Sequence, residues 1–479
     1  MLCATSTPGG ITRSMYVQRL LRSGGGSFRN SPRAFAAVED SLRSCSGRGR
    51  SARRPGFTRS FRTFCALGPR LRTSSSSASI SKCSARSALR FGASCVGTQP
   101  RFASARSTTA RLRSCSSTRC IDKLRLWSEE VKHIVDTFPV RVLLTGSSST
   151  LVARGGRESL AGRVFTTELP PFTFREVLEC WEPEKAKLLP PALRFSEVFD
   201  GALVESCKAL EGLRPHQELS LRHSLEKYYN RGGYPRLHSG EVDDDRWADY
   251  LVQTIFENVL GADIPDLFPV ENPALLRNIY LSVARLSGQE IAQTRPATLA
   301  SEAGIPANQP TVGKYLRYLA DALLIREFRR YPRAKRLSAR VPSKITVSDL
   351  GVRNAVFRGA PSLWESDPGI IGSLVETVVQ GVIRDHNLHV HFFRDHERTG
   401  DQRSVIREVD FVAERIDGAI VPIEVKFRKR IDSEDLAGMR HFRSRFKTPF
   451  GVVVTRDESR WDPENRLLLV PLLHFLLAF

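Results

Sequence analysis

Residues 408–427, EVDFVAERIDGAIVPIEVKF, constrain the fold most, because they predict two alternating strands joined by a tight turn. Asp417-Gly418 between the two runs is a strong short-range hairpin signal. In the second strand Glu424 and Lys426 are two residues apart, so their side chains share one face. The stretch therefore predicts a β-hairpin with charged groups on one surface.

The type of turn decides which residues face each other. A two-residue turn would place Asp410 opposite Val425, whereas a three-residue turn over 416–418 places Asp410 opposite Glu424. The second turn needs Gly418 in the left-handed region, which glycine adopts readily. We predict this turn, because it gathers two carboxylates and an ammonium group. Since close carboxylates repel unless a divalent cation lies between them, this geometry predicts a metal site.

A plainer interpretation of the same hairpin is available. Both runs are good amphipathic strands, and Glu424 and Lys426 on one solvated face would make an ordinary surface pair.

Composition divides the chain near residue 120. Residues 1–120 hold 22 of the 72 Lys and Arg residues, only one of them Lys, with seven of the nine cysteines and two acidic residues. No apolar periodicity persists there, so we expect a disordered Arg/Ser-rich segment. A nucleic-acid-binding arm and an organelle transit peptide are two interpretations. We favour a third, that the segment is mistranslated or begins at a mispredicted start.

Residues 121–479 carry 50 basic and 49 acidic residues and are long enough for two or three domains. Only Cys180 and Cys207 fall in this part, as expected of a reducing compartment. The most apolar stretch, 467–479, is too short to span a bilayer. We therefore expect a soluble cytoplasmic protein without a membrane partner.

Residues 140–144 predict a buried strand that ends in small hydroxyl residues at 145–149, which is typical of a parallel α/β sheet. Residues 298–331 predict a helix pair followed by a strand, the order of a winged helix-turn-helix. The region that follows is basic, and such a cluster suits DNA phosphates. A solvated loop or a module for domain contacts is the alternative. The basic residues are Arg326, Arg329, Arg330, Arg333, Lys335, Arg336, Arg340 and Lys344.

From residue 369 the patterns predict the order α-β-β-β-α-β, with a helix near 370–379, a strand at 390–393, the hairpin, a helix over 434–446 and a strand at 450–455. This order describes a small α/β domain.

Seven motifs in fixed order resemble a known family. They are TGSSS (145–149), SLAGRV (159–164), LPPFTFREV (169–177), RGGYP (231–235), the helix pair, SKITVSDLGVRN (343–354) and the EVDFV…PIEVK hairpin. Over 121–479 the chain resembles prokaryotic AAA+-type ATPases that end in a restriction-endonuclease-like, PD-(D/E)XK-type domain of unknown function.

This resemblance implies ATP as a cofactor and a set of nucleotide-site residues. Asp122 would be the Mg²⁺-linked carboxylate, Thr145 and Ser147 would lie near the γ-phosphate, and Arg163 near the nucleotide or a neighbouring subunit of a homo-oligomer. Where the family has a catalytic Glu, this chain has Lys123. No GxxxxGK[ST] motif occurs anywhere in the sequence, so the triphosphate lacks its principal cradle. We therefore expect a degenerate ATPase.

The same resemblance assigns the C-terminal acids. Glu376, Asp410 and Glu424 would hold Mg²⁺, and Asp410, Glu424 and Lys426 would be the catalytic set. For DNA contact the candidates are Arg329, Arg330, Arg333, Lys335 and Arg336.

The expected architecture is an α/β chain with four parts. These are the segment 1–120, the C-terminal part of an AAA+ core at 121–215, a helical and winged-helix domain at 216–345 and a nuclease-like domain at 346–479. The expected function is an AAA+ family ATP-binding-type protein without a Walker A motif, fused to a nuclease-like domain that acts on DNA. Two alternatives stay open, a Mg²⁺-dependent DNA nuclease and a non-catalytic DNA-binding or interaction protein.

Overall fold

The computed structural model describes residues 168–479 except 289, 292–293, 303, 332–342, 385–387 and 399–403. It also describes short pieces at 63–66, 113–115, 132, 136 and 141–142. The chain divides into two compact units, residues 1–169 and 170–479, and each is considered by itself.

In the first unit the described strands form a small antiparallel sheet in the order β2-β1-β3. The strand predicted at 140–144 is present in part as β3, but it pairs antiparallel with β1 rather than within a parallel sheet. The strands are β1 Thr63–Ala66, β2 Arg113–Cys115 and β3 Arg141–Val142.

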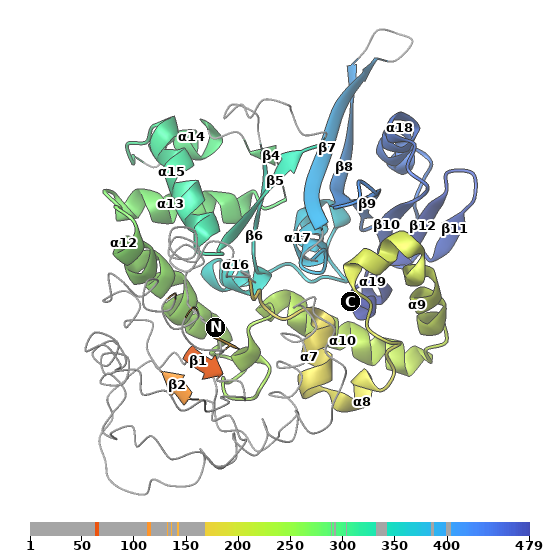
Figure 1. The fold of residues 1–479 in the computed structure, drawn as a ribbon, viewed down its shortest axis with the longest axis horizontal. Helices are drawn as coiled ribbons and strands as arrows, with labels where there is room; N and C mark the ends of the chain where they lie inside the picture. The colour runs from red at the N-terminus through yellow and green to blue at the C-terminus, as the bar shows by residue number, and fades with distance from the viewer. Residues whose placement is uncertain are drawn as a thin grey trace, which may run out of the picture. The chain divides into compact units, whose positions relative to one another are not determined.

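The second unit is mixed α/β, and helices make up most of its first half (Figure 1). Its helices are α7 Phe174–Trp181, α8 Pro183–Ala186, η1 Phe195–Asp200, α9 Ala202–Glu211, α10 Pro215–Arg231, η2 Pro235–Leu237, α11 Trp247–Leu251, η3 Val252–Phe256, η4 Val259–Asp263, α12 Ile264–Leu267, α13 Pro273–Arg285, α14 Thr294–Glu302, α15 Gln309–Asp321, α16 Leu350–Val356, α17 Pro368–Gln380, η5 Glu434–Leu436, α18 Ala437–Phe446 and α19 Leu472–Ala478.

Nine strands form one mixed sheet in the order β11-β12-β10-β9-β8-β7-β5-β6-β4. The strand β5 follows the predicted helix pair, but it pairs parallel with β7 and so lies inside this large sheet. The strands are β4 Glu290–Ile291, β5 Ile325–Arg330, β6 Ser343–Val347, β7 Leu388–Arg398, β8 Ser404–Arg415, β9 Ile420–Lys426, β10 Gly451–Thr455, β11 Arg460–Asp462 and β12 Leu467–Pro471.

The sheet is covered on both faces, which explains why its central strands are apolar on both sides. Alternate residues of β8, β9 and β10 pack with α17 and α19 in the main hydrophobic core. The intervening residues pack against α18 in a smaller core around Phe442. The predicted order α-β-β-β-α-β from residue 369 is confirmed by α17, β7, β8, β9, α18 and β10.

The predicted three-residue turn is confirmed. The β8–β9 ladder ends at the turn with the pair Glu414 and Ile420, and the amide of Gly418 donates to the carbonyl of Arg415 at 2.8 Å. Gly418 has φ +86°, the left-handed conformation that this turn requires. Continued past Phe411, this register sets Asp410 opposite Glu424.

A β-bulge lies at the position of this aspartate. On β7 the register advances by two residues, from His391 to Phe393, while β8 passes from Val412 to Val409. Asp410 and Phe411 therefore both oppose one residue of β7. Bulges of this kind redirect a side chain and end local pairing.

Three of the sequence motifs meet around close backbone contacts in the helical half. Phe172 donates to the carbonyl of Gly233 at 2.8 Å, and Gly233 donates to the Asp349 carboxylate at 2.8 Å. A Cβ at Gly233 would lie 2.1 Å from the carbonyl oxygen of Phe172, so only glycine fits. The motifs LPPFTFREV, RGGYP and SDLGVRN are thus held together by these hydrogen bonds.

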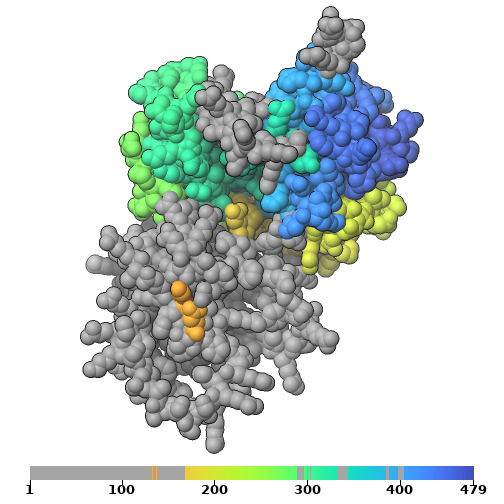
Figure 2. Space-filling view, turned by 45° about the horizontal axis from the view of Figure 1, so that its top comes forward, coloured from red at the N-terminus to blue at the C-terminus, as the bar shows by residue number. Residues whose placement is uncertain are grey.

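The apolar C-terminal segment 467–479 forms the buried strand β12 and the buried helix α19, and α19 packs against α7 and α9. Figure 2 shows the blue C-terminal residues beside the yellow-green helices from the start of the unit. The buried Arg175 of α7 reinforces this packing by donating to the carbonyls of Leu477 and Pro190, each at 2.6 Å.

Candidate acid–lysine site

The two hairpin carboxylates lie just beyond Phe411 and Ile423, the pair at which the β8–β9 ladder ends. Beyond that pair, backbone amides of the two strands donate to the carboxylate side chains and not to backbone carbonyls of the partner strand. The amide of Asp410 donates to Glu424 Oε2 at 3.2 Å, and the amide of Val425 donates to Asp410 Oδ2 at 2.8 Å. Both carboxylates are therefore held rigidly by backbone groups.

A lysine from β6, which is separated from β8 by β7 and β5 in the strand order, contacts one of these carboxylates. Lys344 of β6 is 1% exposed, and its Nζ lies 2.8 Å from Asp410 Oδ1 and 2.7 Å from Glu376 Oε2 of α17. Its ammonium also lies 5.1 Å from the ring centroid of Phe411, the second residue of the bulge. Lys344 thus connects β6, β8 and α17.

A second ion pair completes the cluster. Lys426 Nζ lies 2.5 Å from Glu424 Oε1, and the Lys426 side chain is 29% exposed, whereas that of Glu424 is 5% exposed. The interpretation of these two residues as a solvated surface pair is therefore wrong, because Glu424 is buried. We call Lys344, Glu376, Asp410, Glu424 and Lys426 the acid–lysine site.

Burial and charge set the protonation of the three acids. Burial raises the pKa of Glu376 and of Glu424 to about 8, and the Asp410 carboxylate adds to both shifts. Burial acts in the same direction on Asp410, but Lys344 and Lys426 outweigh it and hold the pKa of Asp410 below its usual value. The site therefore combines three carboxyl groups with two ammonium groups, and Asp410 is the acid that ionises most readily.

The fit to a divalent cation fails in this arrangement, although three carboxylates are the right donors for Mg²⁺. The ammonium of Lys344 lies at hydrogen-bond distance from two of them. Among the described residues no group of three or more His, Cys, Asp or Glu side chains is placed to hold a metal ion. The positive charge that a metal would supply comes here from lysine.

Lys344 is the site residue that the sequence did not reveal. The sequence groups it with the basic residues after β5 as a phosphate-binding candidate, and that interpretation is wrong because the side chain is buried against two acids. The available signal was its place in the apolar run Lys344-Ile-Thr-Val, where a strand buried on both faces carries one lysine.

The remaining DNA-contact candidates are only partly described. Arg329 is exposed on β5, and Arg330 is half-buried and donates to the carbonyl of Arg394. Arg333, Lys335 and Arg336 lie outside the described residues. The nucleotide-site candidates Asp122, Thr145, Ser147 and Arg163 also lie outside them.

Three family models match successive parts of the chain. Residues 121–178 match an AAA domain, 222–362 match a domain of unknown function (DUF8612), and 371–475 match another domain of unknown function (DUF4143). These matches support an AAA-type ATPase-like family. The AAA match contains all four nucleotide-site candidates.

Two curated relatives are uncharacterised proteins. One, from Methanocaldococcus jannaschii, is 24% identical over 202 residues, which cover 42% of this chain and 39% of that protein. The other, from Haemophilus influenzae, is 20% identical over 322 residues, which cover 67% of this chain and 68% of that protein. The chain thus matches about two fifths of the first relative's length. No helix in the described part is long and apolar enough to cross a bilayer.

Proposed function

We propose that this protein is an AAA-type ATPase-like protein whose C-terminal part is a nuclease-like domain in a metal-free, non-cleaving form. In this function the domain binds DNA and does not cut it. The observation that carries the proposal is the ammonium of Lys344, which lies 2.7 and 2.8 Å from the carboxylates of Glu376 and Asp410.

An ammonium in this position substitutes for a metal ion by compensating the same charge. A buried acid pair is strongly unfavourable without a cation, and removal of one partner from a buried ion pair typically destabilises a protein by about 3–5 kcal/mol. Lys344 is nearly inaccessible to solvent, so water does not supply that compensation. The site is therefore stable without Mg²⁺ and has no open position for it.

The test is the substitution Lys344→Met, which keeps the length of the side chain and removes its charge. We expect wild-type protein to show no change in melting temperature with Mg²⁺ or Mn²⁺. The variant should melt lower and regain stability when either ion is added, because the freed carboxylates then bind it. At ~10 mM, an ion bound with a Kd of ~1 mM would add about 1.4 kcal/mol.

The control is the double variant Lys344→Met, Asp410→Asn, which removes the central carboxylate and should lose the response to the ions. Stabilisation of the wild type by Mg²⁺, together with Mg²⁺-dependent cleavage of a DNA duplex, would overturn the proposal.

That outcome would instead support the second candidate, a Mg²⁺-dependent DNA nuclease. One observation favours it. Lys426 is the most exposed member of the acid–lysine site and directly contacts Glu424, as a lysine beside a reacting phosphate would. For this candidate Lys344 would have to leave the two acids.

The ATPase-like half is proposed from the AAA match over 121–178. Since the sequence has no GxxxxGK[ST], we propose that it does not hydrolyse ATP by itself. Isothermal titration of the full chain with ATP and Mg²⁺ measures whether the nucleotide binds. ATP turnover by the purified protein would contradict the proposed lack of hydrolysis.

A further inference from the structure

A second charged site lies at the C-terminal ends of two helices. An open pocket of about 490 Å³ is bordered by the end of α13, the end of α16 and the turn that follows α16. It is lined by Arg285, Arg353, Phe357, Arg358, Gly359, Ala360 and Pro361. None of these lining residues is acidic, so the pocket has a strongly positive wall.

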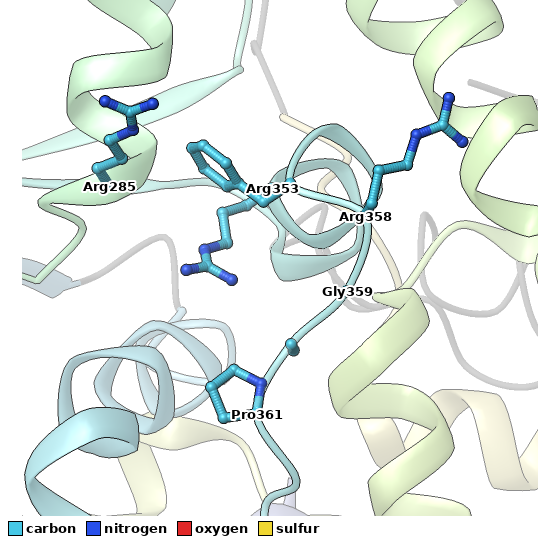
Figure 3. A pocket seen from close by; sticks show the side chains of 7 residues that line it. Arg285, Arg353, Arg358, Gly359 and Pro361 are labelled. Atoms are coloured by element: carbon cyan, nitrogen blue, oxygen red, sulfur yellow. The ribbon is translucent and has the colours of Figure 1, made fainter.

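Two of its three guanidinium groups have no ion-pair partner among the described residues. Arg358 forms an ion pair with Asp249, whereas no ion pair among the described side chains involves Arg285 or Arg353. Arg285 and Arg353 both line the pocket, and Figure 3 shows Arg358 pointing away from these two side chains. Two unpaired positive charges that face one opening favour an anionic ligand.

Arg353 is the better buried of the two. Its Nη1 donates to Asn354 Oδ1 at 3.0 Å, but its buried Nε has no hydrogen-bond partner within the described part of the chain. Burial also lowers the pKa of this guanidinium, although arginine remains charged at neutral pH. A charged donor that is removed from water and left without an acceptor is unfavourable, and a bound anion would relieve this.

The aromatic ring of Phe357 orients both arginines. The Cζ atoms of Arg353 and Arg285 lie 5.0 and 5.7 Å from its ring centroid. Cation–π contacts of this length hold guanidinium planes in place without neutralising their charge. The forks are therefore arranged before any ligand arrives, which reduces the entropy lost on binding.

The turn that borders the pocket has an unusual backbone. Arg358 has φ +60° and Gly359 has φ +143°, and a Cβ at Gly359 would meet no atom within 4 Å. Space is thus free at Gly359, but its backbone conformation is one that other residues rarely adopt. Strained backbone of this kind is concentrated at ligand-binding segments.

A simpler account covers only part of these observations. Arg285 and Arg353 each lie in the last turn of a helix, where the macrodipole favours cations. The dipole explains why arginines occur there, but it does not explain why both approach one ring and one opening.

We propose that this arginine pocket binds the phosphate group of a small phosphorylated molecule. Guanidinium forks match phosphate oxygens in a bidentate way, and two forks suit a phosphate with more than one negative charge. The volume lies within the range of small-molecule sites. The proposal is independent of the function proposed for the acid–lysine site.

The test is isothermal titration of the full-length protein with inorganic pyrophosphate. We expect Arg285→Gln and Arg353→Gln each to weaken binding at least tenfold. Arg353→Lys, which keeps the charge but loses the fork, should also weaken it. The matched control is Arg246→Gln, an exposed arginine at the start of α11 that is outside the pocket, which should change the affinity less than twofold.

Thermal unfolding of each variant without ligand separates a loss of binding from a loss of folding. The proposal fails if wild type does not bind pyrophosphate, or if Arg246→Gln weakens binding as much as the pocket variants do. A second arm titrates a short DNA duplex. Tighter binding of the duplex than of pyrophosphate, lost in Arg353→Gln, would assign the pocket to nucleic-acid phosphates and overturn the small-molecule assignment.

Discussion

Asn354 is the clearest case of a single polar side chain that holds distant segments together. Its Nδ2 donates to the carbonyls of Tyr229 and Asn230 at 3.0 and 3.1 Å, and the residue is fully buried. Those carbonyls belong to the last turn of α10, where helical partners run out. Asn354 therefore caps the C-terminus of α10 from α16.

We predict that Asn354→Ala lowers the free energy of unfolding by about 2–4 kcal/mol. The substitution leaves two buried carbonyls without a donor, at about 1–3 kcal/mol for each unsatisfied group, although some of this is recovered by relaxation. Urea denaturation followed by circular dichroism measures the effect. In the control Asn230→Ala, on the same helix, the lost amide bonds only the carbonyl of Glu226 one turn earlier, and a change below about 1 kcal/mol is expected. Equal losses in both variants would contradict this account of Asn354.

Lys344 is a site residue whose ion-pair partners could not be predicted from the sequence. A charged residue within an apolar strand is an anomaly that sequence can register, but its partners are 32 and 66 residues away along the chain. No local pattern reports such a pairing, and its nearness to a basic run suggested the opposite environment. Glu376, Asp410, Glu424 and Lys426 were found because turn chemistry and the family motifs placed them.

At the scale of the element, the β8–β9 hairpin was predictable because its register depends on the turn alone. Asp417-Gly418 and the alternation on both sides were sufficient to set Asp410 opposite Glu424. The bulge at Asp410 and Phe411 was not predictable. It arises from pairing with β7, and nothing in the sequence of β8 marks an extra residue.

Two glycine-to-alanine substitutions test this account of the turn, because they are expected to change the free energy of unfolding in opposite directions. We predict that Gly418→Ala destabilises the protein by about 1 kcal/mol, because φ +86° is unfavourable for a residue with a Cβ. Gly372→Ala in α17 should stabilise it by about 0.5–1 kcal/mol, because alanine favours helix. At neither position would the new Cβ meet an atom within 4 Å, so backbone conformation is the only difference. Chemical denaturation of both variants checks this, and destabilisation of equal size at both sites would argue against it.

On the scale of the whole molecule, one sheet joins residues from the helical half of the second unit to those of its C-terminal half. The helix pair and strand expected at 298–331 are present as α14, α15 and β5, but their assignment to a winged helix stays a prediction. The pairing of β5 with β7 could not be read from the sequence, because parallel partners are separated by long connections whose ends carry no shared signal.

This continuity predicts how fragments behave. A fragment of residues 346–479, the domain expected from sequence, should fail to fold cooperatively, whereas 170–479 should unfold in one sharp transition. The shorter fragment lacks β5 and most of β6 and exposes the edge of β7, an unpaired row of backbone groups that promotes aggregation. It also lacks Lys344, which leaves the buried acids Glu376 and Asp410 without their shared cation. Size-exclusion chromatography and urea denaturation of both fragments measure this. A monomeric 346–479 with a sharp transition would show that the C-terminal half is stable without the strands and the lysine that precede it.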